Sequence, residues 1–197
     1  MITEPSRPEP VTRILAISGS LRRSSSNTAL LGAAVRLAPR GVKMTLYDGL
    51  AELPHFNPDL ERSEPSAVLD FRAQIATSDG VLISSPEYAH GVPGALKNAL
   101  DWIVGSGELV DKPVALLNAS PRATHAQASL LETITVMSAD VIEKALVTIP
   151  LLGKNLDEFG IAADPELSHL LLRAITEFTR AIEISAPGAA RLSIRFS

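Results

Sequence analysis

Short apolar runs alternate along this chain with longer segments in which apolar residues recur every three or four positions. The continuous runs at 13–18, 42–47, 80–84, 113–117 and 144–149 are typical of buried β-strands. The periodic segments at 27–38, 66–76, 95–104, 125–138 and 164–185 predict helices that each bury one face. This alternation predicts an α/β fold, a five-stranded parallel sheet in the order 2-1-3-4-5 with helices on both faces.

The helix ends are marked by residues with known positional preferences. Asn27 suits the N-cap of the first helix, because its side-chain oxygen can accept from an unpaired backbone N–H. Pro39 and Gly41 end that helix. Asp164 is expected to cap the last helix, with Pro165 in its first turn. On that last helix, Leu171, Ile175, Phe178 and Ile182 predict the buried face.

Composition and charge narrow the protein class. The 197 residues are 46% hydrophobic and 20% charged, which favours one folded domain over 11–185, between a polar arm at 1–10 and an unassigned tail at 186–197. The net charge of −4 is not concentrated in a basic stripe, so a nucleic-acid partner is disfavoured. With no cysteine, thiolate chemistry and disulfides are excluded. No apolar run reaches the roughly 20 residues of a membrane span, and no signal peptide is recognisable, so we expect a cytoplasmic protein.

Three polar loops follow strands one, three and four of the predicted sheet. They occupy 19–26, 85–94 and 118–124, and those strands are neighbours in the order 2-1-3-4-5. Ligands of such sheets bind beyond the carboxyl ends of the strands. We therefore expect the three loops to build one binding site, while the long loop at 48–65 serves a site or an interface.

The first loop has the composition of a phosphate cradle. Ser20, Arg22, Ser25 and Asn27 supply donors directly before a helix N-terminus, where the helix dipole favours an anion. The loop contains neither G-x-x-x-x-G-K-[ST] nor G-x-G-x-x-G, which disfavours nucleoside triphosphates and Rossmann-bound dinucleotides. A single phosphate monoester fits better. A serine-rich turn that merely caps a helix is the alternative.

Two motifs resemble those of the NAD(P)H-dependent FMN reductase-like family. GSLRRSSSN at 19–27 is similar to that family's GSLRxxSxN, and PEYAHGVPGALKNALDW at 86–102 is similar to its PEYNxSxPGxLKNAIDW. The spacing of strands and helices also corresponds over about 12–185. The resemblance implies a flavodoxin-like three-layer sandwich.

The resemblance also implies a cofactor and an activity. FMN would be bound, with Ser20, Arg22, Ser25 and Asn27 on its phosphate, residues 86–88 (Pro86, Glu87, Tyr88) along the ring and ribityl chain, and Ser120 closing the pocket. NADPH or NADH would donate hydride in a ping-pong cycle to a small-molecule electron acceptor such as a quinone, flavin, azo or nitro compound. No catalytic side chain or metal is expected, and the family commonly forms homodimers or homotetramers. A flavodoxin-like electron carrier and a regulatory flavin-binding protein are the alternatives.

The chain departs from the family motifs at two places, and several residues have more than one interpretation. Ala89 stands where the family has asparagine, and Pro121 with Arg122 replaces a glycine-rich third loop. Glu87 either orients the flavin or faces solvent. Tyr88 either packs beside the ring or lies in the core. We further expect Arg23 on the surface, His90 as an ordinary loop residue, and Trp102 at a helix or subunit interface.

Overall fold

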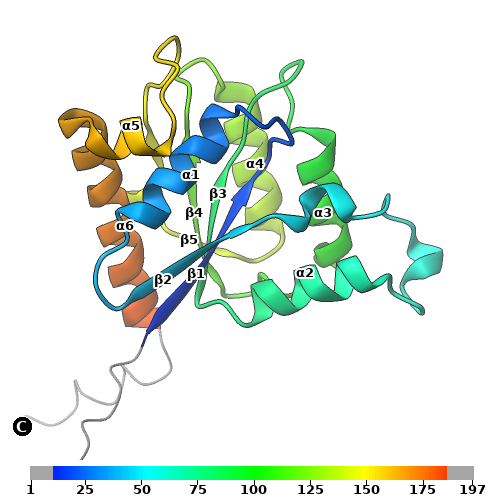
Figure 1. Cartoon of the computed structure of the whole chain (residues 1–197). Coiled ribbons are helices and arrows are strands. Elements are labelled where there is room, and N and C mark those ends of the chain that lie inside the picture. The colour runs from blue at the N-terminus through cyan, green and yellow to red at the C-terminus, as the bar shows by residue number, and fades with distance from the viewer. Residues whose placement is uncertain (1–10, 186–197) are drawn as a thin grey trace, which may run out of the picture.

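Parallel strands form a single sheet in the computed structural model, which describes residues 11–185 (Figure 1). The path is β2-β1-β3-β4-β5, with β6 also paired to β4, which confirms the predicted order. The strands are β1 (Thr12–Ser18), β2 (Val42–Tyr47), β3 (Gly80–Ser84), β4 (Pro113–Asn118), β5 (Asp140–Val141) and β6 (Val147–Thr148). The predicted arm at 1–10 and tail at 186–197 lie outside the described residues.

Helices cover both faces of the sheet. Figure 1 shows α1 (Ser26–Arg36), α5 (Glu158–Ala163) and α6 (Pro165–Ser185) on one side. The other side carries α2 (Ser66–Ala76), α3 (Gly94–Val104) and α4 (Thr124–Val136). Three short 3-10 helices complete the elements: η1 (Gly49–Glu52), η2 (Pro58–Leu60) and η3 (Glu143–Ala145).

Alternation along the central strands divides the core into two halves. In β1, Ile14 and Ala16 join the half under α1, α5 and α6, whereas Leu15 and Ile17 join the half under α2, α3 and α4. Both sets are buried, because each face of the sheet is covered. This explains why the strands read as continuous apolar runs in the sequence. The predicted face of α6 is buried as well, including Phe178.

The predicted fifth strand at 144–149 is wrong in its extent. Only β6 of that run pairs with β4, at Leu117–Asn118, and the start of β4 pairs instead with the earlier β5. Between them, η3 turns Ala145 into the core against α6. The edge of the sheet is therefore interrupted, and η3 stands where a continuous strand was predicted.

The predicted N-cap of the first helix is also wrong. Ser25 is the N-cap of α1, and its Oγ accepts from the backbone N–H of Thr28 at 3.3 Å. Asn27 lies in the first turn of α1 instead. The cap at Asp164 is confirmed, since its Oδ1 accepts from the N–H groups of Glu166 and Leu167. Helix α5 was not predicted, because its six residues are too few for a periodic pattern.

The long loop at 48–65 is fastened to α3. Asn98 accepts from the N–H of Phe56 at 2.7 Å and donates to the carbonyl of Pro54 at 2.9 Å. Trp102 is 3% exposed, donates its indole N–H to the same carbonyl and meets Phe56 edge to face. Trp102, which was expected at a helix or subunit interface, thus packs against a loop. None of the helices within 11–185 is long and apolar enough to cross a bilayer.

Candidate functional site

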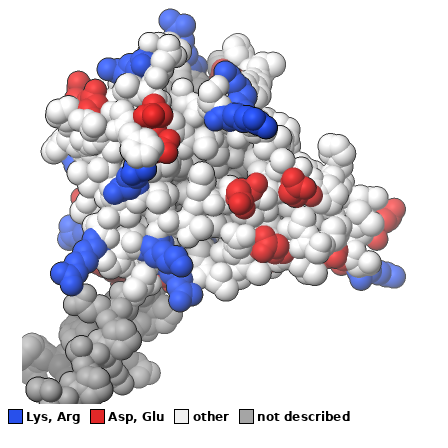
Figure 2. Space-filling model, in the orientation of Figure 1, with Lys and Arg blue, Asp and Glu red and all other residues white. Residues whose placement is uncertain are grey.

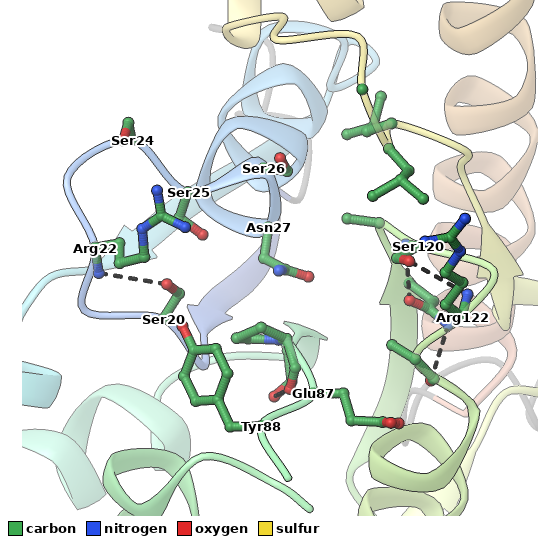
Figure 3. Close-up of a pocket in the computed structure, with 18 of the residues that line it drawn as sticks. Ser20, Arg22, Ser24, Ser25, Ser26, Asn27, Glu87, Tyr88, Ser120 and Arg122 are labelled. Atoms are coloured by element: carbon green, nitrogen blue, oxygen red, sulfur yellow. Dashed lines mark hydrogen bonds between the residues drawn. The ribbon is translucent and has the colours of Figure 1, made fainter. Parts of the chain in front are cut away.

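A cavity of about 470 Å³ opens at the carboxyl end of the sheet, where the three polar loops meet (Figure 3). All eight residues predicted for the site line it: Ser20, Arg22, Ser25, Asn27, Pro86, Glu87, Tyr88 and Ser120. Residues from three separate segments therefore converge on one volume, as the parallel topology requires.

The loop after β1 offers hydroxyl and backbone donors to this cavity. Ser20 Oγ accepts from the backbone N–H of Arg22 at 3.3 Å, and Ser25 Oγ caps α1. Because both oxygens accept from the backbone, each hydroxyl hydrogen stays available to a ligand. The N–H groups of Ser26 and Asn27, in the first turn of α1, have no partner within the described part of the chain. Such a helix N-terminus binds anions well.

Asn27 adds an oriented amide. Its side chain is 7% exposed, and its Oδ1 accepts from the Ser84 hydroxyl at the end of β3 at 2.9 Å. That bond assigns the oxygen to the protein and leaves the Nδ2 donors without a partner among residues 11–185. Since Asn27 lines the cavity, these donors are open to a ligand there.

Arg22 and Arg23 differ in position although they are adjacent. Arg22 lines the cavity and lies beside Ser25 in Figure 3, and no carboxylate within 11–185 pairs with it. Arg23 lines only a neighbouring cavity, of about 490 Å³, which Arg22 also lines. Only Arg22 is placed to meet a ligand in the first cavity.

The loop after β3 turns sharply at the cavity rim. Tyr88 and Gly91 exchange two backbone hydrogen bonds, N–H of Tyr88 to O of Gly91 at 3.1 Å and N–H of Gly91 to O of Tyr88 at 2.9 Å. Tyr88 is 51% exposed, so its interpretation as a core residue is wrong. Glu87 does not simply face solvent either, because its Oε2 accepts from the backbone N–H of Ala126 in the first turn of α4 at 2.9 Å.

The loop after β4 repeats the turn of the first loop. Ser120 Oγ accepts from the N–H of Arg122 at 3.2 Å, just as Ser20 Oγ accepts from that of Arg22. Asn118 supports the turn by accepting from the N–H of Ser120 and donating to the carbonyl of Ala123. Two Ser-x-Arg turns thus line one cavity, as Figure 3 shows.

A fourth segment, which the sequence analysis missed, completes the lining. It follows β6 and contributes Leu151, Leu152, Gly153 and Asn155. The carboxyl end of every parallel strand faces the ligand edge, so the same rule that predicted the first three loops also points to this one.

The first two loops approach each other closely at Gly19. A Cβ on Gly19 would lie 2.6 Å from Ser85 Oγ and 3.0 Å from Leu96 Cδ2, and the Gly19 N–H already donates to the Ser84 carbonyl. Glycine is required here because a side chain would push the loops apart. This contact sets the spacing between the loop after β1 and the loop after β3, which carries Tyr88.

The charges of the site favour an anion. Arg22 and Arg122 line the cavity, and the one lining carboxylate, Glu87, is already engaged by the helix N-terminus. On the face drawn in Figure 2, basic and acidic groups are separated by uncharged areas. Within 11–185, no cluster of His, Asp or Glu has the composition of a metal site. The donor set thus suits a phosphate monoester.

Comparison with known proteins gives concordant matches. The profile of the NADPH-dependent FMN reductase family matches residues 12–150. An NAD(P)H-dependent FMN reductase of Pseudomonas aeruginosa is 34% identical over 165 residues, which cover 81% of this chain and 89% of that protein. An NADPH:quinone oxidoreductase of Arabidopsis thaliana is 40% identical over 56% of this chain and 59% of its own length.

The solved structures agree with the fold. FerB, a flavoenzyme NAD(P)H:(acceptor) oxidoreductase from Paracoccus denitrificans, superposes with a TM-score of 0.72 at 28% identity, over 88% of this chain and 98% of that one. An azoreductase from Bacillus anthracis has a TM-score of 0.54 at 16% identity, which supports the fold alone. The flavodoxin-like architecture predicted from the sequence is confirmed.

Proposed function

The chain belongs to the NADPH-dependent FMN reductase family and is an FMN-dependent NAD(P)H oxidoreductase, and we propose that the loop after β1 holds the FMN phosphate in the cavity described above. Ser20, Ser25, Asn27 and the guanidinium of Arg22 would donate to it. The observation that carries this assignment is the set of cavity-lining donors left without a protein partner in the described part of the chain, above all the Nδ2 of Asn27.

The remaining lining residues would position the ring and ribityl chain. We assign Pro86 and Tyr88 to one side and Ser120 to the closing loop. Because the Glu87 carboxylate is bound to α4, Glu87 would hold its loop rather than touch the flavin with its side chain. Bound FMN supplies uptake of a hydride equivalent from NAD(P)H and delivery of electrons to the acceptor, so no protein acid or base is needed.

We propose small planar molecules of the quinone type as acceptors. Tyr88 and Leu152 are 51% and 55% exposed and line the same cavity, so they offer apolar surface to a flat ring. The names of the Arabidopsis relative and of a quinone reductase of Escherichia coli, 34% identical over 52% of this chain and 54% of its own length, support this class.

Turnover is favoured over the two non-catalytic alternatives, the electron carrier and the regulatory flavin-binding protein, because the named relatives are enzymes. We also propose that the protein is cytoplasmic and that a homodimer or homotetramer covers the exposed rim around Tyr88 and Leu152. Light scattering of the purified protein, with and without FMN, measures the oligomeric state.

An anaerobic titration tests the proposed function directly. Protein saturated with FMN should show a flavin spectrum that NADPH or NADH bleaches, and a quinone added afterwards should restore the colour. The rate of each half-reaction, measured separately, distinguishes a reductase from a carrier. Protein that neither contains FMN nor takes it up would contradict the proposal.

A further inference from the structure

Two histidines stack beside the cavity. The rings of His90 and His125 lie 4.3 Å apart, centroid to centroid, with 17° between their planes. His90 belongs to the rim turn after β3, and His125 to the first turn of α4. Neither lines the cavity itself, so the pair has no assigned role in the proposed function.

The turn that carries His90 is strained. Ala89 and His90 have φ angles of 48° and 60°, both in the left-handed region, and the turn is closed by the two hydrogen bonds between Tyr88 and Gly91. Hairpin turns of this kind normally use Gly, Asn or Asp at these positions. Two non-glycine residues in that conformation persist only where surrounding contacts hold them.

Two contacts join this turn to the start of α4. Glu87 accepts from the N–H of Ala126, and one residue earlier in α4 His125 stacks on His90. We propose that His125 is a positioning residue, which holds the strained turn, and with it Pro86 and Tyr88, in the geometry that receives the flavin. This inference rests on the proposed function, because it assigns a task to residues around the same cavity.

Two substitutions at His125 test the stacking contact. His125→Phe keeps an aromatic ring, and His125→Ala removes it. His125→Ala should weaken FMN binding by about threefold to tenfold, the range for loss of an aromatic pair. His125→Phe should bind FMN within about twofold of the wild type. His169→Ala, at an exposed position on α6, is the matched control and should follow the wild type.

Proton NMR of the FMN-free protein gives a readout independent of activity. Stacking should shift the ring protons of His90 upfield, and His125→Ala should return them to the positions of His55 and His169. Unshifted His90 resonances, or equal FMN affinities of the wild type and His125→Ala, would overturn the positioning role. A wild type that binds no FMN would contradict the proposed function instead. In that case amide exchange at Gly91 still tests the inference: if it is as slow in His125→Ala as in the wild type, His125 does not stabilise the turn.

Discussion

Replacing Arg22 by alanine tests most directly whether the loop after β1 holds the FMN phosphate. Arg22 lines the cavity beside Ser25 and has no carboxylate partner within 11–185, so the substitution removes a ligand contact without leaving an unpaired acidic group. A hydrogen bond to a charged group contributes about 1.5–3 kcal/mol, which corresponds to roughly 10-fold to 150-fold in affinity. Because Arg22 is exposed to solvent, we expect the lower part of that range.

Fluorescence quenching of FMN on binding measures the loss of affinity in Arg22→Ala. Two further variants serve as controls. Arg23→Ala removes the same charge from the same loop, but Arg23 lines the other cavity, so its FMN affinity should stay within about twofold of the wild type. Arg22→Lys keeps the charge without the planar fork and should recover part of the affinity. The difference between Arg22→Ala and the wild type should shrink as salt is added.

Riboflavin, which lacks the phosphate, supplies the internal check. Arg22→Ala should bind riboflavin as well as the wild type does, because the lost contact is to the phosphate. Equal losses for Arg22→Ala and Arg23→Ala, or an equal loss for riboflavin and FMN, would refute the assignment of the phosphate to this loop.

Three further predictions concern the scaffold of the site. Gly19→Ala places a Cβ 2.6 Å from Ser85 Oγ and should lower the free energy of unfolding by about 1–3 kcal/mol in urea titrations and weaken FMN binding, whereas Gly94→Ala, with nothing within 4 Å, should do neither. Asn98→Ala leaves the N–H of Phe56 without its acceptor and should cost about 1–3 kcal/mol of stability, with accelerated amide exchange in the 48–65 loop and little change in FMN affinity. Burial, with the charges of Asp70 and Asp48 adding to it, raises the pKa of Tyr47 to about 12 from 10.0. A raised pKa stabilises the fold below pH 10, and the benefit is lost between about pH 10 and 12, so the wild type should lose up to about 2–3 kcal/mol relative to Tyr47→Phe over that range, and parallel stability curves would contradict this.

The central strands and most helices follow from the sequence alone. Ile14 to Ile17 form a continuous apolar run because a parallel strand is covered on both faces, and that run fixes β1 without further information. The order of the strands and the edge at which ligands bind follow from the alternation of strands and helices. Residues 19–27 and 86–88 could therefore be assigned to one site before their geometry was known.

The tertiary structure decided how individual polar groups are used. Whether Asn27 caps its helix or reaches Ser84 depends on where the end of β3 lies, and a local pattern does not contain that position. The same holds for Glu87, whose partner Ala126 is 39 residues away, and for the ring of His90 on His125. Side-chain partners at such separations are set by the packing of whole elements, whereas strand and helix identity is set by periodicity within one element. The sequence thus determined the fold and the edge of the sheet at which the polar loops lie, and only the packed chain decided which donors remain free for a ligand.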